Sequence, residues 1–174
     1  MNIKGYDMFL RFGKNGAKIA SSIVRRLLYK DKTVCFAESC TGGLATCTLL
    51  GVPGASSVLH ESYITYSDSA KKKILGVSED TLALHGAVSK KCAVEMALNA
   101  RRIAGADYGV SITGYAGPSS NGENRVGVVF IAISRKRRTI VREYKFKGDR
   151  NKIRQRAALE SLSMLDNELR NVEG

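Results

Sequence analysis

The chain has 174 residues, of which 44% are hydrophobic and 25% are charged. This length and composition suit one domain with an ordinary buried core. No apolar run approaches the ~20 residues that a membrane-spanning helix needs. Residues 1–11 contain neither a long apolar core nor a small-residue cleavage site, so we expect no signal peptide. Together these features predict a cytoplasmic protein without a membrane partner.

The charge balance is strongly basic. Lys and Arg number 28 against 16 Asp and Glu, which gives a net charge of +12. Such a balance suggests a nucleic-acid partner. The basic residues are dispersed along the chain, however, and no helix-turn-helix, zinc or RNA-recognition signature accompanies them. A small phosphorylated substrate needs only a few cations, so nucleic acid is the alternative partner rather than the favoured one.

Metal-binding patterns are missing from the sequence. The four cysteines form no CxxC pair and no metal-ligand spacing, so we expect reduced free thiols. His60 and His85 are the only two histidines, which makes a multi-histidine site unexpected. We predict neither a metal nor an organic cofactor.

Hydrophobic periodicity and turn residues divide the chain into alternating helices and strands. The predicted helices cover residues 15–30, 44–50, 68–74, 78–84, 90–104 and 149–171. The predicted strands cover residues 33–37, 57–66, 106–113, 126–134 and 139–146. This alternation predicts one α/β domain over residues 1–174, a three-layer α/β/α arrangement with a mixed, mostly parallel central sheet. Residues 1–14 show no clear period and are expected to form a loosely tied N-terminal arm.

One stretch, Ala37-Glu38-Ser39-Cys40-Thr41-Gly42-Gly43, joins the first predicted strand to a helix. Glycines let backbone N–H groups approach a ligand closely, and a helix N-terminus favours negative charge. Ser39 is therefore either an exposed nucleophile or a helix cap. Cys40 is the rival nucleophile because a thiol is intrinsically more reactive. We expect Glu38 to anchor the loop by accepting backbone N–H bonds.

A lysine is the better candidate for a general base. Neither histidine lies near a carboxylate in a recognisable pattern. A lysine buried beside other cations can lose its proton near neutral pH. Lys71, Lys72 and Lys73 form one run in a predicted short helix, and residue type alone does not choose among them or exclude a solvated face.

Two later segments supply further polar groups. The loop that begins at Thr113 and Gly114 leaves a buried strand, and ligands of open α/β sheets bind at such carboxyl ends. Arg150 and Arg154 lie four residues apart at the start of the last helix, so they share one helical face. Guanidinium groups bind phosphate oxygens bidentately, which makes this helix a candidate phosphate clamp.

Six short motifs follow one another between residues 16 and 170: Ala37-Glu38-Ser39-Cys40-Thr41-Gly42-Gly43, Val52-Pro53-Gly54-Ala55-Ser56, Tyr66-Ser67, Lys71, His85-Gly86-Ala87-Val88-Ser89 and Thr113-Gly114-Tyr115-Ala116-Gly117-Pro118. In this order they resemble the CinA C-terminal domain family. The resemblance implies hydrolysis of the amide of nicotinamide mononucleotide, which yields nicotinate mononucleotide and ammonia. Because no pyrophosphatase domain precedes the motifs, the chain is similar to the stand-alone deamidase form.

The resemblance also implies roles for individual residues. Ser39 is expected to attack the carboxamide carbon and Lys71 to act as its base. Tyr66 and Thr113 are expected to position the reacting groups. The substrate-binding residues are expected to be Glu38, Thr41, Gly42, Gly43, Gly114, Arg150 and Arg154, with backbone N–H groups around Thr41 to Gly43 holding the oxyanion and one of the two arginines holding the phosphate.

The sequence departs from the family pattern in places. Tyr115 replaces a usual aliphatic residue, and residues 119–125 replace a glycine-rich segment followed by Lys-Pro. Residues 60–62 replace a usually small or glycine-rich stretch. Because of these departures, an amidase that acts on a different pyridine or nucleoside amide is an alternative function. A non-catalytic, nucleic-acid-associated accessory protein is the other alternative, and a homo-oligomer is expected because a neighbouring copy can complete a site of this kind.

Overall fold

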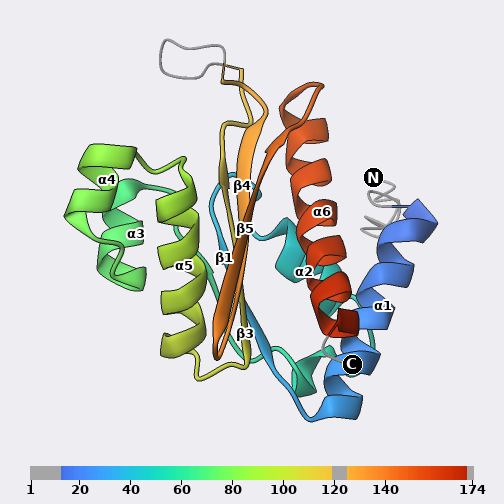
Figure 1. Ribbon diagram of the computed structural model, residues 1–174. Helices are drawn as coiled ribbons and strands as arrows, with labels where there is room; N and C mark the ends of the chain where they lie inside the picture. Colours follow the sequence, from blue (N-terminus) through green and yellow to red (C-terminus); the bar gives the residue numbers. More distant parts are fainter. Residues whose placement is uncertain (1–12, 119–124, 172–174) are drawn as a thin grey trace, which may run out of the picture.

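The computed structural model describes residues 13–118 and 125–171 (Figure 1). The expected N-terminal arm falls outside these residues, except that the first helix already begins at Gly13. Five strands form one sheet in the order β2-β1-β3-β4-β5. Their bounds are β1 (Val34–Glu38), β2 (Ser62–Ile64), β3 (Tyr108–Gly114), β4 (Val128–Arg135) and β5 (Arg138–Lys145).

The sheet is mixed. Strand β1 pairs in parallel with both β2 and β3, whereas β4 pairs antiparallel with both β3 and β5. Strand β4 therefore runs against the direction that the other four strands share. This arrangement confirms the predicted mixed sheet, in which one direction dominates.

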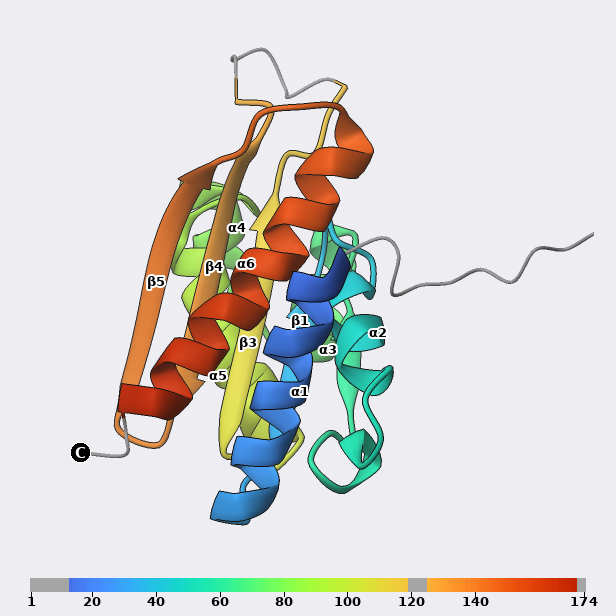
Figure 2. The ribbon, with the colours of Figure 1, turned by 90° about the vertical axis from the view of Figure 1, so that its right-hand side faces the viewer.

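Helices cover both faces of the sheet, so the predicted three layers are present (Figures 1 and 2). One face carries α1 (Gly13–Lys30), α2 (Leu44–Leu50) and α6 (Arg150–Asn171). The other carries α3 (Asp68–Leu75), α4 (Glu79–His85) and α5 (Lys90–Ile103). None of the described helices is long and apolar enough to cross a membrane.

The position of β1 in the core explains why its first four residues are apolar. All five residues of β1 are buried because helices cover the sheet on both sides. Successive side chains of a strand point to opposite faces. Accordingly, Phe36 packs into the cluster beneath α1 and α6, whereas Cys35 and Ala37 pack into the cluster beneath α5. A strand buried in this way holds the residue that follows it in a fixed position.

The predicted strand over residues 57–66 is wrong in its length. Only Ser62–Ile64 pairs with β1, and Ala55–Ser57 forms a short 3-10 helix (η2). The apolar residue Val58 is buried in the core, and its carbonyl accepts a hydrogen bond from Val34 N–H at 2.8 Å. The composition of this segment therefore reflects burial of a loop beneath the sheet rather than continuous strand pairing.

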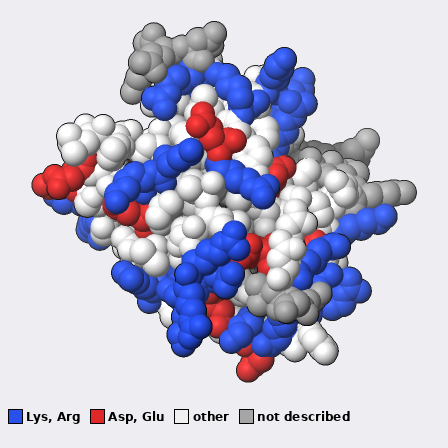
Figure 3. Space-filling view, in the orientation of Figure 1, with Lys and Arg blue, Asp and Glu red and all other residues white. Residues whose placement is uncertain are grey.

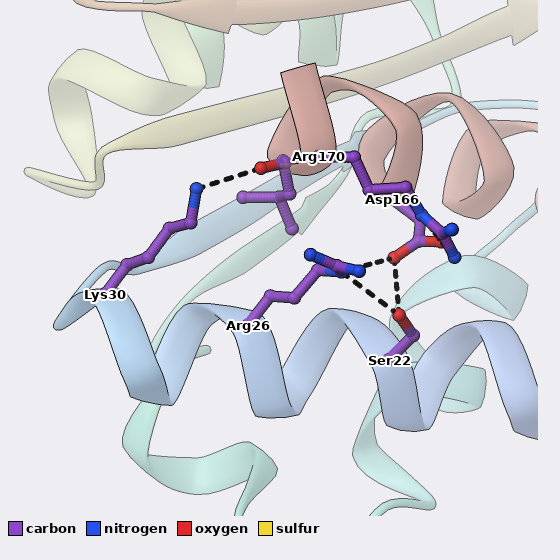
Figure 4. A network of polar contacts seen from close by, with 6 residues as sticks. Ser22, Arg26, Lys30, Asp166 and Arg170 are labelled. Carbon is purple, nitrogen blue, oxygen red and sulfur yellow. Dashed lines mark hydrogen bonds and ion pairs between the residues drawn. The ribbon is translucent and has the colours of Figure 1, made fainter. Parts of the chain in front are cut away.

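A buried carboxylate fastens α1 to α6 (Figure 4). Asp166 is 5% exposed and accepts a hydrogen bond from Ser22 Oγ at 2.7 Å. Arg170 Nη2 lies 2.7 Å from Asp166 Oδ2, and Arg26 Nε lies 3.4 Å from Oδ1. Lys30 adds a 2.9 Å hydrogen bond to a backbone carbonyl near the end of α6. These contacts fix the orientation of α6, whose first residue, Arg150, reaches the candidate site.

Candidate active site

Ser39 lies in the turn between β1 and α2. Its N–H donates to the carbonyl of Ile112 in β3 at 3.0 Å, and its side chain is 7% exposed. The turn closes through Gly42 and Gly43, whose φ angles of 60° and 91° lie in the left-handed region that favours glycine. The sequence thus folds the chain sharply here and holds the hydroxyl against the end of the sheet.

Glu38 anchors the turn, as expected. Its carboxylate is fully buried and accepts hydrogen bonds from the N–H groups of Gly43 (3.0 Å), Ala45 (3.3 Å) and Thr46 (2.8 Å). The Thr46 hydroxyl also donates to it at 2.7 Å. A buried carboxylate is stable only when donors surround it, and here the N-terminus of α2 supplies most of them. Glu38 therefore shapes the turn from beneath and does not line the cavity.

The structure corrects the expectation that the N–H groups of Gly42 and Gly43 hold the oxyanion. Gly42 N–H donates to the Ser39 carbonyl at 3.0 Å, and Gly43 N–H donates to Glu38. Both groups are thus engaged in forming the turn. Among the described residues, no other residue accepts a hydrogen bond from the N–H groups of Cys40 and Thr41. Both groups follow Ser39 directly; Cys40 lines the cavity, whereas Thr41 is fully buried and is not among the lining residues.

Lys71 is the lysine that reaches Ser39. Its side chain is 1% exposed, and Nζ lies 3.0 Å from Ser39 Oγ and 2.9 Å from the carbonyl of Thr65. Helix α3 begins at the Ser67 cap, which accepts a hydrogen bond from Ala70 N–H, and Lys71 follows in its first turn. Burial lowers the pKa of the Lys71 ammonium. The site therefore holds an amine that can lose its proton beside a hydroxyl.

The neighbouring lysines do not enter the site. Lys72 forms an ion pair with Glu79 at the surface, and Lys73 is exposed. Helical geometry turns successive side chains by about 100°, so only one lysine of the run faces the turn that holds Ser39. The geometry thereby makes the choice that residue type left open.

Cys40 is disfavoured as a nucleophile because burial keeps its thiol protonated. The residue is 6% exposed, and its side chain packs into the core cluster beneath α1 and α6. Burial raises the pKa of the Cys40 thiol to about 12. The reactive form of a cysteine is the thiolate, which is scarce at neutral pH under these conditions. Both adjacent candidates line the cavity, and Ser39 is the one that Lys71 Nζ contacts, at 3.0 Å.

A cavity of about 370 Å³ opens over Ser39 and Lys71. Small-molecule sites commonly measure about 300–1,000 Å³. Its lining residues are Ser39, Cys40, Tyr66, Asp68, Lys71, Gly86, Ala87, Val88, Thr113, Gly114, Tyr115, Ala116, Gly117 and Arg150. The structure thus brings together six predicted site residues from five separate segments. Within the described residues, no three His, Cys, Asp or Glu side chains gather as a metal-binding group.

Arg150 and Tyr66 meet at the mouth of the cavity. Arg150 Nη2 donates to the Tyr66 hydroxyl at 2.7 Å, and Nη1 donates to the Gly117 carbonyl at 2.5 Å. Tyr66 is 60% exposed, so this pair is in contact with solvent. The bridge joins the start of α6 to the loops after β2 and β3. It places a guanidinium where an anionic part of a ligand can enter.

Thr113 lies deeper in the cavity. It is 1% exposed, and its hydroxyl donates to the Ala87 carbonyl at 2.8 Å. A hydroxyl that donates in this way keeps lone pairs that accept hydrogen bonds from a ligand. Gly114 follows it, and a Cβ placed there would lie 2.6 Å from a side-chain atom of Val129. The end of β3 therefore accepts only glycine at this position of the cavity wall.

Arg154 has a different place from Arg150. Its Nε donates to the Cys40 carbonyl at 3.1 Å, and its Nη2 donates to the Thr41 carbonyl at 3.0 Å. Arg154 is not among the residues that line the cavity. The first helical turn of α6 thus separates the two arginines: one reaches the ligand space, and the other supports the turn that carries Ser39.

Sequence reasoning missed Asp68 and the wall formed by residues 86–88. Asp68 lies three residues before Lys71, a spacing that puts two helical side chains on one face. That spacing was the available signal. Gly86, Ala87 and Val88 belong to the motif that precedes the Ser89 cap of α5, and the Ala87 carbonyl contacts Thr113.

The family model that describes the CinA C-terminal domain matches residues 16–169. A CinA-like protein of Thermotoga maritima is 46% identical over 155 residues, which are 88% of this chain and 38% of that protein. A putative competence-damage inducible protein of Bacillus pumilus is 42% identical over 159 residues, 91% of this chain and 38% of that protein. The chain therefore spans less than two fifths of the length of these curated relatives.

Solved structures agree with the sequence comparison. A CinA superfamily protein from Klebsiella pneumoniae 700603 superimposes with a TM-score of 0.87 at 30% identity, covering 91% of this chain and 99% of that one. The competence/damage inducible protein CihA from Agrobacterium tumefaciens gives a TM-score of 0.87 at 33% identity, covering 91% and 98%. The six motifs, the matched family model and the shared fold lead to one conclusion: the chain belongs to the CinA C-terminal domain family.

Proposed function

We propose that the protein is a cytoplasmic amidohydrolase that converts nicotinamide mononucleotide to nicotinate mononucleotide and ammonia. The observation that carries the proposal is the 3.0 Å contact between Lys71 Nζ and Ser39 Oγ on the wall of a ligand-sized cavity. Amide hydrolysis needs a nucleophile, a base and donors for the developing oxyanion. The site offers a hydroxyl, a buried amine and two adjacent N–H groups for these tasks.

In the first half of the reaction, neutral Lys71 takes the proton of Ser39 Oγ as that oxygen attacks the carboxamide carbon. The N–H groups of Cys40 and Thr41 donate to the carbonyl oxygen as it becomes negative. The Lys71 ammonium then gives its proton to the amide nitrogen. The carbon–nitrogen bond breaks, ammonia leaves, and an ester joins the nicotinoyl group to Ser39.

In the second half, water attacks the ester carbon. Lys71 accepts a proton from that water and returns it to Ser39 Oγ as the ester bond breaks. The product is nicotinate mononucleotide, and the serine is regenerated. Burial of Lys71 favours its neutral form, which both halves of the reaction require at their start.

Arg150 is proposed to bind the phosphate of the substrate. A guanidinium has five N–H donors in a fixed fork, and two of them serve Tyr66 and Gly117. The remaining donors are available to phosphate oxygens in a charge-assisted geometry. Arg154 is proposed to act indirectly, since its donors hold the carbonyls of the turn.

The experiment is a substrate panel with the purified chain. Ammonia release is measured from nicotinamide mononucleotide, from nicotinamide riboside, which lacks the phosphate, and from free nicotinamide. The proposal expects the mononucleotide to have the highest kcat/KM. Loss of the phosphate contact should lower kcat/KM by about tenfold to a hundredfold, as for a charged hydrogen bond worth about 1.5–3 kcal/mol. A preference for a different pyridine or nucleoside amide would replace the substrate assignment, and release from none of them would overturn the proposal.

The +12 charge motivates the second candidate, a nucleic-acid-associated protein. Figure 3 shows the face of the molecule seen in Figure 1. Lys and Arg lie on it in separate groups, with acidic side chains between them, and do not form one continuous basic stripe. A binding role predicts DNA affinity that falls steeply with salt, because bound phosphates release counterions. A binding isotherm measured at several salt concentrations, alongside the ammonia assay, separates the two candidates.

A further inference from the structure

Charged groups in the cavity come from three side chains among the described residues: Asp68, Lys71 and Arg150. Asp68 is the only acidic one. It is exposed, and its carboxylate makes no hydrogen bond or ion pair with any described residue. The proposed reaction uses Lys71 and Arg150 but leaves this carboxylate without a role.

Asp68 and Arg150 enter the cavity from opposite layers of the fold. Asp68 is the first residue of α3, and Arg150 is the first residue of α6, and these helices cover opposite faces of the sheet (Figure 1). Asp68 lies one helical turn before Lys71, and its negative charge raises the pKa of that ammonium against the larger effect of burial. The carboxylate is thus on the side of the nucleophile, and the guanidinium is on the side of α6.

We propose that Asp68 selects substrates whose amide-bearing ring is positively charged. This inference rests on the proposed function and names the substrate property that the cavity recognises, the positive charge of the ring. The nicotinamide ring of the mononucleotide carries a positive charge on its nitrogen, and the phosphate carries a negative one. A carboxylate from α3 and a guanidinium from α6 complement that pair of charges.

The same carboxylate acts on the product. Hydrolysis replaces a neutral carboxamide with a carboxylate at the carbon that Ser39 attacks. The new negative charge lies on the side of the cavity that Asp68 occupies, so the two repel. Asp68 therefore favours the substrate over its product, and its removal should strengthen product binding.

An acidic residue in the first turn of a helix also stabilises the helix by interacting with its dipole. Asp80 has this structural position in α4, is exposed, and does not line the cavity. Asp80→Asn is therefore the matched control for Asp68→Asn. A purely structural role of Asp68 predicts that both changes alter stability slightly and that neither alters the choice of substrate.

Binding is measured by calorimetry in a Ser39→Ala background, which removes turnover, with and without Asp68→Asn. The probes are nicotinamide mononucleotide, its 1,4-dihydro form, whose ring is neutral, and nicotinate mononucleotide. At a charge separation of a few ångströms, Asp68→Asn should weaken binding of the cationic probe by about tenfold and binding of the neutral probe by less than about twofold. It should also tighten binding of the product. The Asp80→Asn control should leave all three affinities unchanged.

Equal effects of Asp68→Asn on the cationic and neutral probes, or no effect on either, would overturn this inference. That result is distinct from failure of the proposed function, which appears as a lack of ammonia release by the wild-type enzyme. A wild type that hydrolyses the mononucleotide, together with an Asp68→Asn variant that retains the charge preference, refutes the role of Asp68 alone.

Discussion

The Nζ atom of Lys71 lies 3.0 Å from the Oγ atom of Ser39, although 32 residues separate them in the chain. The contact arises because β2 pairs with β1 and delivers α3 to the end of the strand that precedes Ser39. Nζ also contacts the Thr65 carbonyl at 2.9 Å, which holds the long side chain in place. A short edge strand thereby positions the base that the proposed reaction needs.

The rate of amide hydrolysis should rise with pH and then level off. Lys71 must be neutral to accept the Ser39 proton, and burial lowers the pKa of Lys71 from its ordinary 10.5. The rising limb of kcat/KM should therefore have its midpoint below 10.5, in a profile measured from about pH 5 to 11.5. Lys71→Arg should be inactive throughout, because a guanidinium does not deprotonate in this range. A limb centred at 10.5 would contradict the role of a desolvated base.

The buried amine should also give stability a specific pH dependence. Between the lowered folded pKa of Lys71 and the unfolded value of 10.5, the unfolded chain binds more protons, so the free energy of unfolding rises with pH. Wild type should therefore gain stability relative to Lys71→Met as pH rises through this window. Below the folded pKa the difference should be constant. Urea unfolding at several pH values measures it, and Lys73→Met, at an exposed position of α3, controls for the loss of one positive charge.

The two arginines at the start of α6 should have different kinetic effects. Arg150→Ala should raise KM for the mononucleotide by about tenfold or more with a smaller change in kcat, because it removes a phosphate contact. Arg154→Ala should mainly lower kcat, because the carbonyls of Cys40 and Thr41 lose the guanidinium that holds them. Steady-state kinetics of both variants test this. The reverse pattern would assign the phosphate to Arg154.

Alkylation of the folded protein should occur at Cys47 first. Cys47 is exposed, whereas the other three thiols are buried. Burial raises the pKa of Cys40 to about 12 and that of Cys92 to about 11, so their thiolates are scarce at neutral pH. Mass spectrometry after brief iodoacetamide treatment should find one labelled site in the native protein and four after denaturation. Rapid native labelling of Cys40 would restore it as a candidate nucleophile.

Asp166→Asn should destabilise the protein without impairing the site. Breaking its contacts with Ser22 and Arg170 should cost about 1–3 kcal/mol, at the level of a charged hydrogen bond, since the arginine is partly solvated. Asp166 lies about 24 Å along α6 from Arg150 at a rise of 1.5 Å per residue. Urea unfolding should show the loss, and kcat/KM below the unfolding transition should stay at the wild-type level. A selective loss of kcat/KM would reveal coupling along the helix.

The periodicity of the sequence predicted the layers well because burial on one or both faces determines the pattern. The strand expected over residues 33–37 is Val34–Glu38, and the helix expected over 90–104 is Lys90–Ile103. The strand predicted over residues 57–66 is too long, because apolar side chains of this segment are buried in the core although their backbone forms a loop. Hydrophobic composition indicates that a segment is buried. Strand pairing depends in addition on whether its backbone lies beside another strand, which composition does not show.

The site residues within the turn motif were predictable from the sequence. Those on helices were less predictable, because their positions depend on the orientation of each helix. Ser39 and Glu38 lie where the turn motif put them, but three consecutive lysines were equivalent until the orientation of α3 was known. Arg150 and Arg154 share a face, yet one helical turn moves the second beneath the turn that holds Ser39. The donors at the two glycines were misassigned because sequence does not show that the turn itself engages them.

The central claim is that Ser39, with Lys71 as its base, hydrolyses nicotinamide mononucleotide. The most direct test measures ammonia release from the mononucleotide by wild type and by Ser39→Ala, with calorimetry to confirm that the variant still binds the substrate. We predict release by wild type and a fall in kcat of about 10³-fold or more in the variant, as for other serine nucleophiles. Release by Ser39→Ala at the wild-type rate would contradict it.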